Sequence, residues 1–237
     1  MDNNQSVLLD LLQKTISIFD ENNIWYSLAC GSVLGAVREG GFIPWDSDID
    51  IFVKITDISR IQSIFSDEMD GLVLVSYKKD TTSSHDKISM KGYDHTKIHI
   101  DLYPLIGMPN SEIHGRVFIK KCHYLNKLLA CKYENVNTVR NKYKAKIFTL
   151  INYLEQFVSD DFLRRIISRL ETKYPFETSN KLSYIANDGH YREAINRDIL
   201  LETKETYFEG IRVKIPLNYT FYLEQVYGKD YMIPKKY

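Results

Sequence analysis

The chain is poor in cysteine, proline and tryptophan, and it carries no excess of charge of either sign. Its 237 residues include three cysteines, six prolines and two tryptophans, and 31 basic residues balance 31 acidic ones. Cys30, Cys122 and Cys131 form neither a disulfide framework nor a zinc spacing, and their odd number favours a reducing compartment. A net charge of zero disfavours binding to a long polyanion, so we predict no nucleic acid partner.

Long hydrophobic runs are also missing. No segment approaches the roughly 18 apolar residues that a membrane-spanning helix needs. Residues 1–19 carry acid and amide side chains where a signal peptide has a basic start, and their apolar positions recur at helical spacing. We therefore expect a cytoplasmic protein, with peripheral contact at the inner face of a membrane left open.

One stretch, residues 30–53, organises the predictions about function. It reads CGSVLGAVREGGFIPWDSDIDIFV, which predicts a tight Gly31-Ser32 turn that opens a short helix, then a Gly-rich loop, then a strand. Side chains two apart on a strand point to the same face, so we expect Asp48 and Asp50 side by side, with Ile49 and its apolar neighbours in the core.

Paired carboxylates on one patch suggest a cation, because each raises the pKa of the other unless a positive charge offsets them. Oxygen ligands without interleaved histidine or cysteine favour Mg²⁺ or Mn²⁺ over zinc. A calcium loop that begins at Asp46 is one alternative, but its sixth position should be glycine and is Ile51. A solvated acidic turn is another, and it leaves the alternating apolar residues unexplained.

Several neighbouring residues are candidates for binding phosphate. Gly31 and Ser32 stand at a helix N-terminus, where backbone N–H groups and the helix dipole suit an anion, although a plain helix cap is the commoner role. Arg38 could donate two hydrogen bonds to a phosphate or form a surface ion pair with Glu39. Lys87, on a strand expected over residues 87–91, could reach the same phosphates or lie solvated at a sheet edge.

Aromatic residues offer a further kind of contact. Trp45 could present a flat face to a base or to a cationic head group, or it could anchor its loop. A tyrosine-rich tail could form a cage around a quaternary ammonium ion, although core packing is the more common role of such residues. These tyrosines are Tyr219, Tyr222, Tyr227 and Tyr231.

Three separated blocks resemble the LicD family, which belongs to the nucleotidyltransferase superfamily and includes the fukutin-related proteins. The blocks are LGAVREGGFIPWDSDIDI at residues 34–51, IHIDLYPL at residues 98–105, and residues 207–232 with FEGIRVKIP and YGKDYM. The chain departs from the family at Ser47, where a further Asp is usual.

This resemblance implies a metal-dependent enzyme that transfers a phospho-alcohol group from a cytidine diphosphate (CDP) alcohol, most often CDP-choline, to a sugar hydroxyl. It implies catalytic and metal-binding roles for Asp48, Asp50 and a third carboxylate, Asp101. Gly31, Ser32 and Arg38 would hold the phosphate that stays behind, with Asp46 as a further substrate contact.

The acceptor implied is a lipopolysaccharide, teichoic or capsular glycan, which could be lipid-linked. Two alternatives stay open. One is a nucleotidyltransferase that moves a nucleoside monophosphate to a protein or small molecule. The other is a catalytically silent glycan-binding protein, which the three intact acids disfavour.

The predicted fold is α/β (α+β), with a nucleotidyltransferase-like mixed sheet flanked by helices and a mainly helical middle and C-terminal portion. We predict a catalytic core over residues 1–115, and a helical region over 116–237 whose last strand and helix elements pack on that core. Further predicted elements are helices over 6–21, 55–69 and 218–227, strands over 24–29, 72–77 and 95–103, the last ended by Pro104, a largely helical stretch over 116–173, and a strand or hairpin over 207–215.

Overall fold

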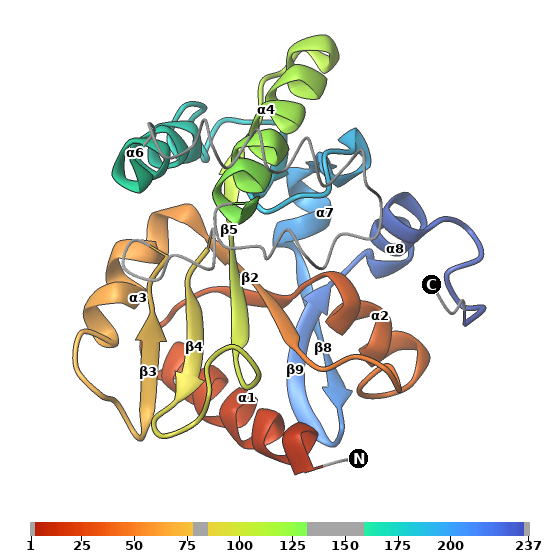
Figure 1. Cartoon of the computed structure of the whole chain (residues 1–237). Helices are drawn as coiled ribbons and strands as arrows, with labels where there is room; N and C mark the ends of the chain where they lie inside the picture. Colours follow the sequence, from red (N-terminus) through yellow and green to blue (C-terminus); the bar gives the residue numbers. More distant parts are fainter. Residues whose placement is uncertain (1–2, 78–84, 132–158, 235–237) are drawn as a thin grey trace, which may run out of the picture.

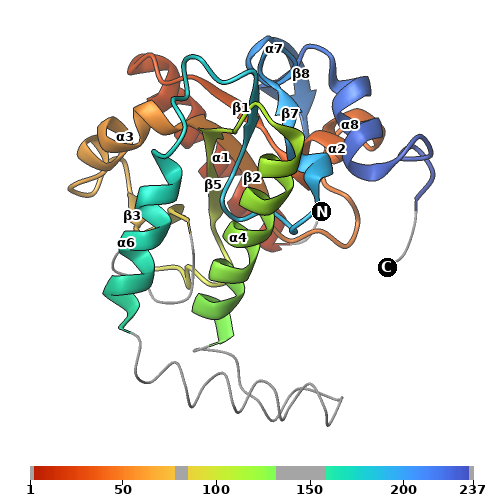
Figure 2. The same cartoon turned by 90° about the horizontal axis from the view of Figure 1, so that it is seen from above.

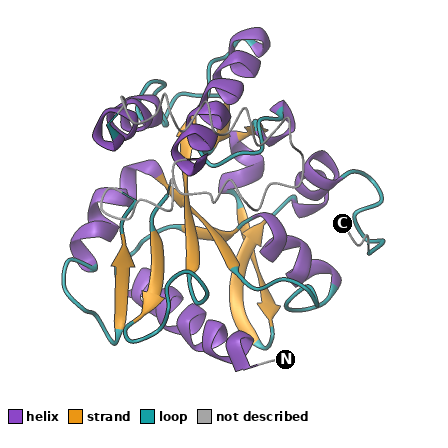
Figure 3. Cartoon of the chain, in the orientation of Figure 1, coloured by secondary structure: helices purple, strands orange, loops and turns teal. Residues whose placement is uncertain are grey.

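The computed structural model describes residues 3–77, 85–131 and 159–234, and within them a mixed sheet forms the central layer (Figures 1 and 3). Its strand order is β1-β2-β5-β4-β3, and β6 and β7 extend it from β5. The strands are β1 (Tyr26–Leu28), β2 (Ile49–Lys54), β3 (Leu72–Val75), β4 (Lys87–Met90), β5 (Ile100–Gly107), β6 (Lys181–Ser183) and β7 (Ile195–Asn196), with a separate hairpin of β8 (Thr203–Phe208) and β9 (Ile211–Pro216). Only β2 and β5 are paired in parallel among the described strands. The predicted α/β class with a mixed sheet is confirmed.

Helices surround this sheet. They are α1 (Asn3–Glu21), α2 (Cys30–Arg38), α3 (Ile58–Ile64), α4 (Glu112–Cys131), α6 (Asp160–Glu171), α7 (Arg197–Leu201) and α8 (Tyr219–Tyr227), with short 3-10 turns η1 (Ile55–Asp57) and η3 (Tyr191–Glu193). Within the described residues, no helix is long and apolar enough to cross a membrane.

The main core lies between α1 and the sheet. Leu8, Leu11 and Leu12 recur at helical spacing on α1 and are fully buried, as are Ile49 and Ile51 of β2. Helix α1 contacts β4, β5 and β9, so the amphipathic helix predicted at the N-terminus closes one side of the core.

A second, smaller core joins α4 to α6, which lie side by side in both views (Figures 1 and 2). Phe118 and Cys122 of α4 pack with Leu163 and Ile167 of α6. These helices confirm part of the predicted helical stretch, whereas its segment over residues 145–157 lies outside the described residues. The predicted domain boundary at residue 115 stays a prediction.

Two predicted elements have different bounds in the structure. The helix predicted over 55–69 ends at Ile64, because residues 66–68 continue with polar side chains and the chain then turns through Asp70 and Gly71 in the left-handed region. Ile61 of this helix is fully buried, whereas Ile58 and Ile64 are half-buried.

The strand predicted over 95–103 begins only at Ile100 and continues past Pro104 to Gly107. Pro104 pairs with Val53 of β2, whereas on its other side β5 pairs with β4 at residues 100–101 and with β6 at residues 106–107. Because Pro104 lies between these two pairings, its missing N–H breaks no hydrogen bond of the ladder. The expectation that Pro104 ends the strand was therefore wrong.

The C-terminal elements agree with the sequence. The predicted hairpin is β8–β9, which contacts β1 through β9. Helix α8 begins after Asn218, whose side chain accepts a hydrogen bond from Phe221 N, and it ends at Gly228, whose φ is 93°.

Candidate active site

Asp50 and Asp101 lie directly opposite each other on the two parallel strands at the centre of the sheet. The register pairs Asp50 with Asp101 and Ile49 with Ile100, so both acids point to the same face. Asp48 immediately precedes β2, and one carboxylate oxygen from each of the three acids lies within 4.8 Å of the others. The structure thus brings together the three acids singled out from the sequence.

Asp50 is buried, with 8% of its surface exposed. Burial raises its pKa well above the ordinary value, and the negative charges of Asp48 and Asp101 raise it further. The backbone N–H of Gly31 donates to the Asp50 carboxylate and acts in the opposite direction. A cation at this position would remove much of the electrostatic cost of ionising Asp50.

Asp101, in contrast to Asp50, lies among basic side chains. His85 Nε2 lies 2.9 Å, Lys87 Nζ 3.4 Å and His99 Nε2 3.5 Å from its Oδ1 atom. Burial raises the pKa of Asp101, but the close approach of the two histidines and the charge of Lys87 outweigh that effect and lower the pKa below its ordinary value. Asp101 is therefore held in its ionised form.

Lys87 was predicted from the sequence to lie near the site, whereas His85 was not. Strand β4 lies inside the sheet between β5 and β3, so Lys87 is half-buried against Asp101 and does not lie at a sheet edge. His85 stands two residues before Lys87 and so shares its face, which an extension of the period-two pattern by one step could have shown. His99, two residues before Asp101, also lies on its face.

Asp46 faces Gly31 at the start of α2. A Cβ atom added to Gly31 would lie 2.8 Å from Asp46 Oδ2, so a larger residue here would displace this carboxylate. Burial raises the pKa of Asp46 from 3.8 to about 7, and a hydrogen bond and repulsion from Asp48 add to the rise. Asp46 thus extends the acidic cluster towards α2.

Ser32 connects α2 to the acidic strand. Its buried Oγ atom accepts a hydrogen bond of 2.9 Å from the backbone N–H of Asp50. Together with the bond from Gly31 N–H to the Asp50 carboxylate, this contact positions Asp50. In the structure, the two residues predicted to bind phosphate hold an acid in place.

Arg38 lies at the other end of α2 and does not join the acids. Its Nε atom forms the ion pair with Glu39 that was weighed from the sequence, at 2.7 Å, and its Nη1 donates to the backbone oxygen of Tyr231 at 3.2 Å. Its side chain is nevertheless only 7% exposed, and it lines a pocket with Trp45 and Tyr227.

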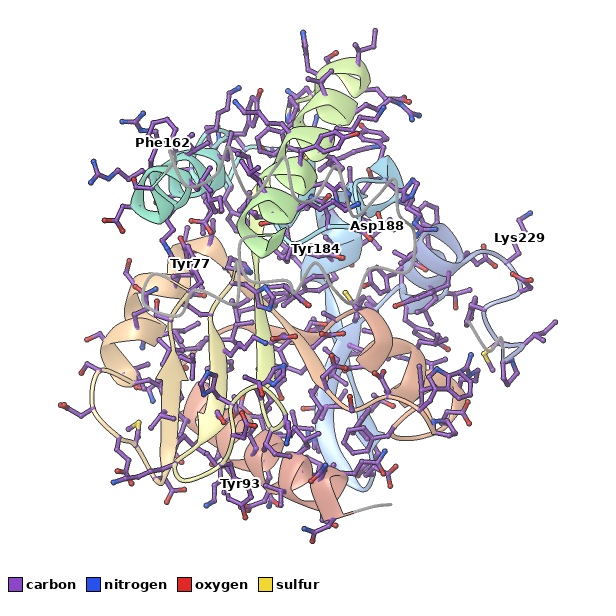
Figure 4. The ribbon with its side chains drawn as sticks, in the orientation of Figure 1. Tyr77, Tyr93, Phe162, Tyr184, Asp188 and Lys229 are labelled. Atoms are coloured by element: carbon purple, nitrogen blue, oxygen red, sulfur yellow. The ribbon has the colours of Figure 1, made fainter. Side chains whose placement is uncertain are left out.

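Aromatic side chains lie next to the acids on the same face of the sheet, because Phe52 and Tyr103 are paired two residues beyond Asp50 and Asp101. Tyr184, which follows β6, packs against Phe52 and Tyr103, with ring centroids 5.5 and 5.1 Å apart, and lies between α4 and the sheet (Figure 4). Tyr222 is 1% exposed and packs on Phe52, so this tyrosine of the predicted cage is a core residue. Tyr184 was missed because a strand of three residues is too short to show a period.

Cys30 contacts this aromatic group, with its Sγ atom 3.5 Å from the hydroxyl oxygen of Tyr184. Cys30 is half-buried, and desolvation and the charge of Asp50 raise the pKa of its thiol well above the ordinary value, so the thiol stays protonated and is a poor nucleophile.

These residues fit a divalent cation bound through oxygen atoms. Three carboxylates converge, and the pKa of Asp50 is raised partly by the other two, which is a repulsion that a cation would relieve. The described residues near the cluster offer no cysteine thiolate, because the Cys30 thiol stays protonated.

The comparisons with known proteins agree on one family. Residues 23–136 match the family described as LicD/FKTN/FKRP, nucleotidyltransferase domain. Lipopolysaccharide cholinephosphotransferase LicD of Haemophilus influenzae is 23% identical over 242 residues, which cover 96% of this chain and 89% of that protein. Ribitol 5-phosphate transferase FKRP is 24% identical in Mus musculus over 98 residues and 25% identical in Homo sapiens over 100 residues, each 41% of this chain and 20% of FKRP. Residues 23–136 of the chain therefore belong to the LicD/FKTN/FKRP family, and the chain is similar to the Haemophilus influenzae cholinephosphotransferase over nearly its whole length.

Proposed function

We propose that this protein transfers a phospho-alcohol group from a CDP-alcohol, with CDP-choline the first candidate, to a sugar hydroxyl of a cell-surface glycan or its precursor. The observation that carries the proposal is the convergence of Asp48, Asp50 and Asp101 in a segment that belongs to the LicD/FKTN/FKRP family. Two similar proteins are a cholinephosphotransferase and a ribitol 5-phosphate transferase, and both names describe transfer of a phosphorylated alcohol.

Asp48, Asp50 and Asp101 would hold Mg²⁺ or Mn²⁺. When bound there, such a cation would neutralise the negative charge that develops on the phosphate during transfer. Because Asp101 is kept ionised by its neighbours, it suits binding of a cation, and its lowered pKa makes it a weak proton acceptor.

Lys87 and the start of α2 would bind the phosphates of the donor. Lys87 Nζ lies within 3.4 Å of Asp101, so its charge is available where a phosphate bound to the cation would sit. Gly31 leaves the backbone of α2 open beside Asp46, and Ser32 fixes that helix on β2. The transfer forms a bond between the acceptor oxygen and the phosphorus that carries the alcohol, and it breaks the bond from that phosphorus to the oxygen bridging the two phosphates. Cytidine monophosphate and the proton of the acceptor hydroxyl are released.

The test uses purified protein, Mn²⁺ and a panel of bacterial glycans with CDP-choline labelled in its choline methyl groups. We expect label on a glycan in step with release of cytidine monophosphate. Asp48→Ala and Asp101→Ala should abolish this transfer while circular dichroism shows folded protein. Asp67→Asn is the control, since Asp67 is exposed and outside the cluster. Near-normal turnover in both alanine variants would overturn the proposal.

A second label separates the nucleotidyltransferase alternative. With ³²P in the phosphate attached to cytidine, phospho-alcohol transfer leaves all label in cytidine monophosphate. Transfer of a nucleoside monophosphate would instead place the label on the acceptor, and that result would also overturn the proposal.

A further inference from the structure

An aromatic pocket adjoins the acidic cluster at the end of α2. Its walls include Trp45, Tyr227 and Tyr231 together with three aliphatic residues, Leu34, Ile43 and Ile233. Helices α2 and α8 lie side by side here (Figures 1 and 2), and the segment after α8 contributes residues to the pocket wall. A mainly apolar wall with a few polar groups suits a small molecule.

Arg38 leaves one hydrogen-bond donor unpaired inside this pocket. Its Nε and Nη1 atoms bond to Glu39 and Tyr231, but its buried Nη2 atom has no hydrogen-bond partner among the described residues. Since a buried donor without a partner is costly, buried polar groups are nearly always paired. An acceptor on a bound ligand would satisfy Nη2.

The pocket is continuous with the candidate catalytic acids through Gly31. Gly31 lines the pocket and also abuts the carboxylates of Asp46 and Asp50. Arg38 is seven residues further along α2, about 10 Å at the helical rise of 1.5 Å per residue. That span matches a nucleoside attached to a phosphate at the acids better than it matches the phosphate itself.

The polar groups of the pocket decide which part of a nucleotide alcohol it suits. The trimethylammonium group of choline has no lone pair and would leave Arg38 Nη2 without an acceptor, which argues against a site for that group. A neutral planar ring can stack on Trp45 and the tyrosines, accept from Arg38 and donate to Asp230, the acid that lines the same pocket. Asp230 follows Lys229, which Figure 4 labels on the segment beyond α8.

We propose that this pocket binds the nucleobase of the nucleotide donor, with Arg38 and Asp230 selecting among bases. Arg38 Nη2 donates to a ring nitrogen or carbonyl oxygen, and the Asp230 carboxylate accepts from an amino or ring N–H group. This inference rests on the proposed function, because that function supplies a nucleotide as substrate.

The two tryptophans of the chain allow a direct test. Trp45 lines the pocket, whereas Trp25 lies elsewhere with its ring 5.7 Å from Lys54 Nζ. In a Trp25→Phe background, the emission of Trp45 is followed during titration with cytidine, uridine, adenosine and guanosine, without metal. We expect saturable quenching by at least one nucleoside, and no saturable change with choline or inorganic pyrophosphate. Quenching by choline alone, by pyrophosphate alone, or by none of these probes would overturn the assignment.

Substitutions then test the two selecting residues. Arg38→Met should weaken nucleoside binding by about tenfold or more, as expected for loss of a charged hydrogen bond. Arg212→Met is the matched control, because Arg212 is an exposed arginine that also pairs with a glutamate, Glu205. Equal affinity in the Arg38 and Arg212 variants would contradict the proposal.

Arg38 also holds the backbone of Tyr231, so its loss could disturb the pocket without any role in base recognition. Asp230→Asn avoids that difficulty because it keeps the shape of the side chain. We expect it to change the ratio of cytidine to uridine affinity, since an amide can donate to the uridine O4 atom where a carboxylate repels it. An unchanged ratio would remove Asp230 from base selection.

Nucleoside binding in the pocket can be tested separately from catalysis. Asp48→Ala should abolish transfer yet leave nucleoside affinity unchanged, since nucleosides carry no phosphate for the acids to bind through a cation. If wild-type protein binds a nucleoside in this pocket but transfers nothing, the proposed function fails alone. If transfer proceeds while the pocket variants keep wild-type nucleotide affinity, the pocket assignment fails alone.

Discussion

The hydroxyl group of Tyr222 accepts a hydrogen bond of 2.9 Å from the backbone N–H of Cys30, a residue 192 positions away in the chain. Cys30 has a φ of 43°, in the left-handed region, and it begins α2 directly after β1. Tyr222 is buried on α8. A C-terminal tyrosine therefore holds the strained turn that positions Gly31 and Ser32 beside Asp50.

Tyr222→Phe should lower the free energy of unfolding by about 1–3 kcal/mol, because it removes the acceptor and leaves the N–H of Cys30 without its partner. Urea unfolding measures the change. Tyr219→Phe on the same helix is the control, since Tyr219 is half-buried and contacts Lys204 through its ring. That variant should stay within about 0.5 kcal/mol of the wild type. Equal losses in the two variants would show that the hydroxyl of Tyr222 contributes little.

Asp50→Asn should stabilise the metal-free protein while it abolishes transfer. The folded pKa of Asp50 is raised above the unfolded value of about 3.9, so the wild type loses stability as pH rises from about 4 through the folded pKa. The asparagine variant has no such loss, so its advantage over the wild type should grow as pH rises from about 4 towards about 8. Thermal unfolding across this pH range, with Asp67→Asn as control, measures the difference.

Added Mn²⁺ should make the wild type more stable than the Asp50→Asn variant. A ligand at a hundred times its dissociation constant adds roughly 2.7 kcal/mol to the protein that binds it, and the variant has lost one of the three acids. If Mn²⁺ stabilises wild type and Asp50→Asn equally, the cluster is not the site where the ion binds.

The acids could be found from the sequence because each depends only on local pattern. Asp50 alternates with apolar residues on β2 and Asp101 does the same on β5, so the period of two predicts which face each side chain takes. Their pairing needed more, because no local signal shows which strands are neighbours. The resemblance to the LicD family provided that information, and the parallel register of β2 and β5 agrees with it.

Other parts of the site depend on contacts between distant segments. Arg38 is read locally as a partner of Glu39, and that ion pair exists, but its place in a pocket depends on Tyr227 and Tyr231 at the other end of the chain. Tyr184 likewise packs on Tyr103 only because β6 pairs with the end of β5. Neither placement has a periodic signal in the sequence, so neither could be predicted.

Glu193 should make stability depend on pH near neutrality. Burial raises its pKa from 4.5 to about 7, and the charge of Asp188 adds to the rise. Because the folded pKa is the higher one, the stability contributed by the protonated form is present below about pH 4.5 and is lost as pH rises through about 7. The loss has an upper bound of about 3 kcal/mol.

Glu193→Gln should flatten this part of the stability profile, because an amide does not ionise. The amide oxygen still accepts the hydrogen bond that the Asp188 backbone N–H donates to Glu193 at 3.0 Å. Chemical unfolding at about pH 5 and about pH 8 gives the comparison. Glu224→Gln, an exposed position on α8, should leave the wild-type profile unchanged. A profile that keeps its slope without Glu193 would assign the pH dependence to another group.

Gly35→Ala should separate α2 from the loop that leads to the acids. An added Cβ atom would lie 2.3 Å from the carbonyl oxygen of Gly41, and backbone on both sides of the contact must move to relieve it. We expect a loss of about 1–3 kcal/mol, as for other overpacked positions, and weaker Mn²⁺ binding because the loop carries Asp46 and Asp48. Isothermal titration with Mn²⁺ and urea unfolding measure both effects.

Gly115→Ala provides the comparison for that variant. Gly115 lies inside α4, and its added Cβ atom would meet the ring of Tyr191 at 2.6 Å, which is a side chain and can shift. Alanine also gains about 1 kcal/mol of helix propensity over glycine, so the net change should be small and Mn²⁺ binding should persist. If the two variants lose the same stability and both still bind Mn²⁺, the close contact between α2 and its loop does not position the acids.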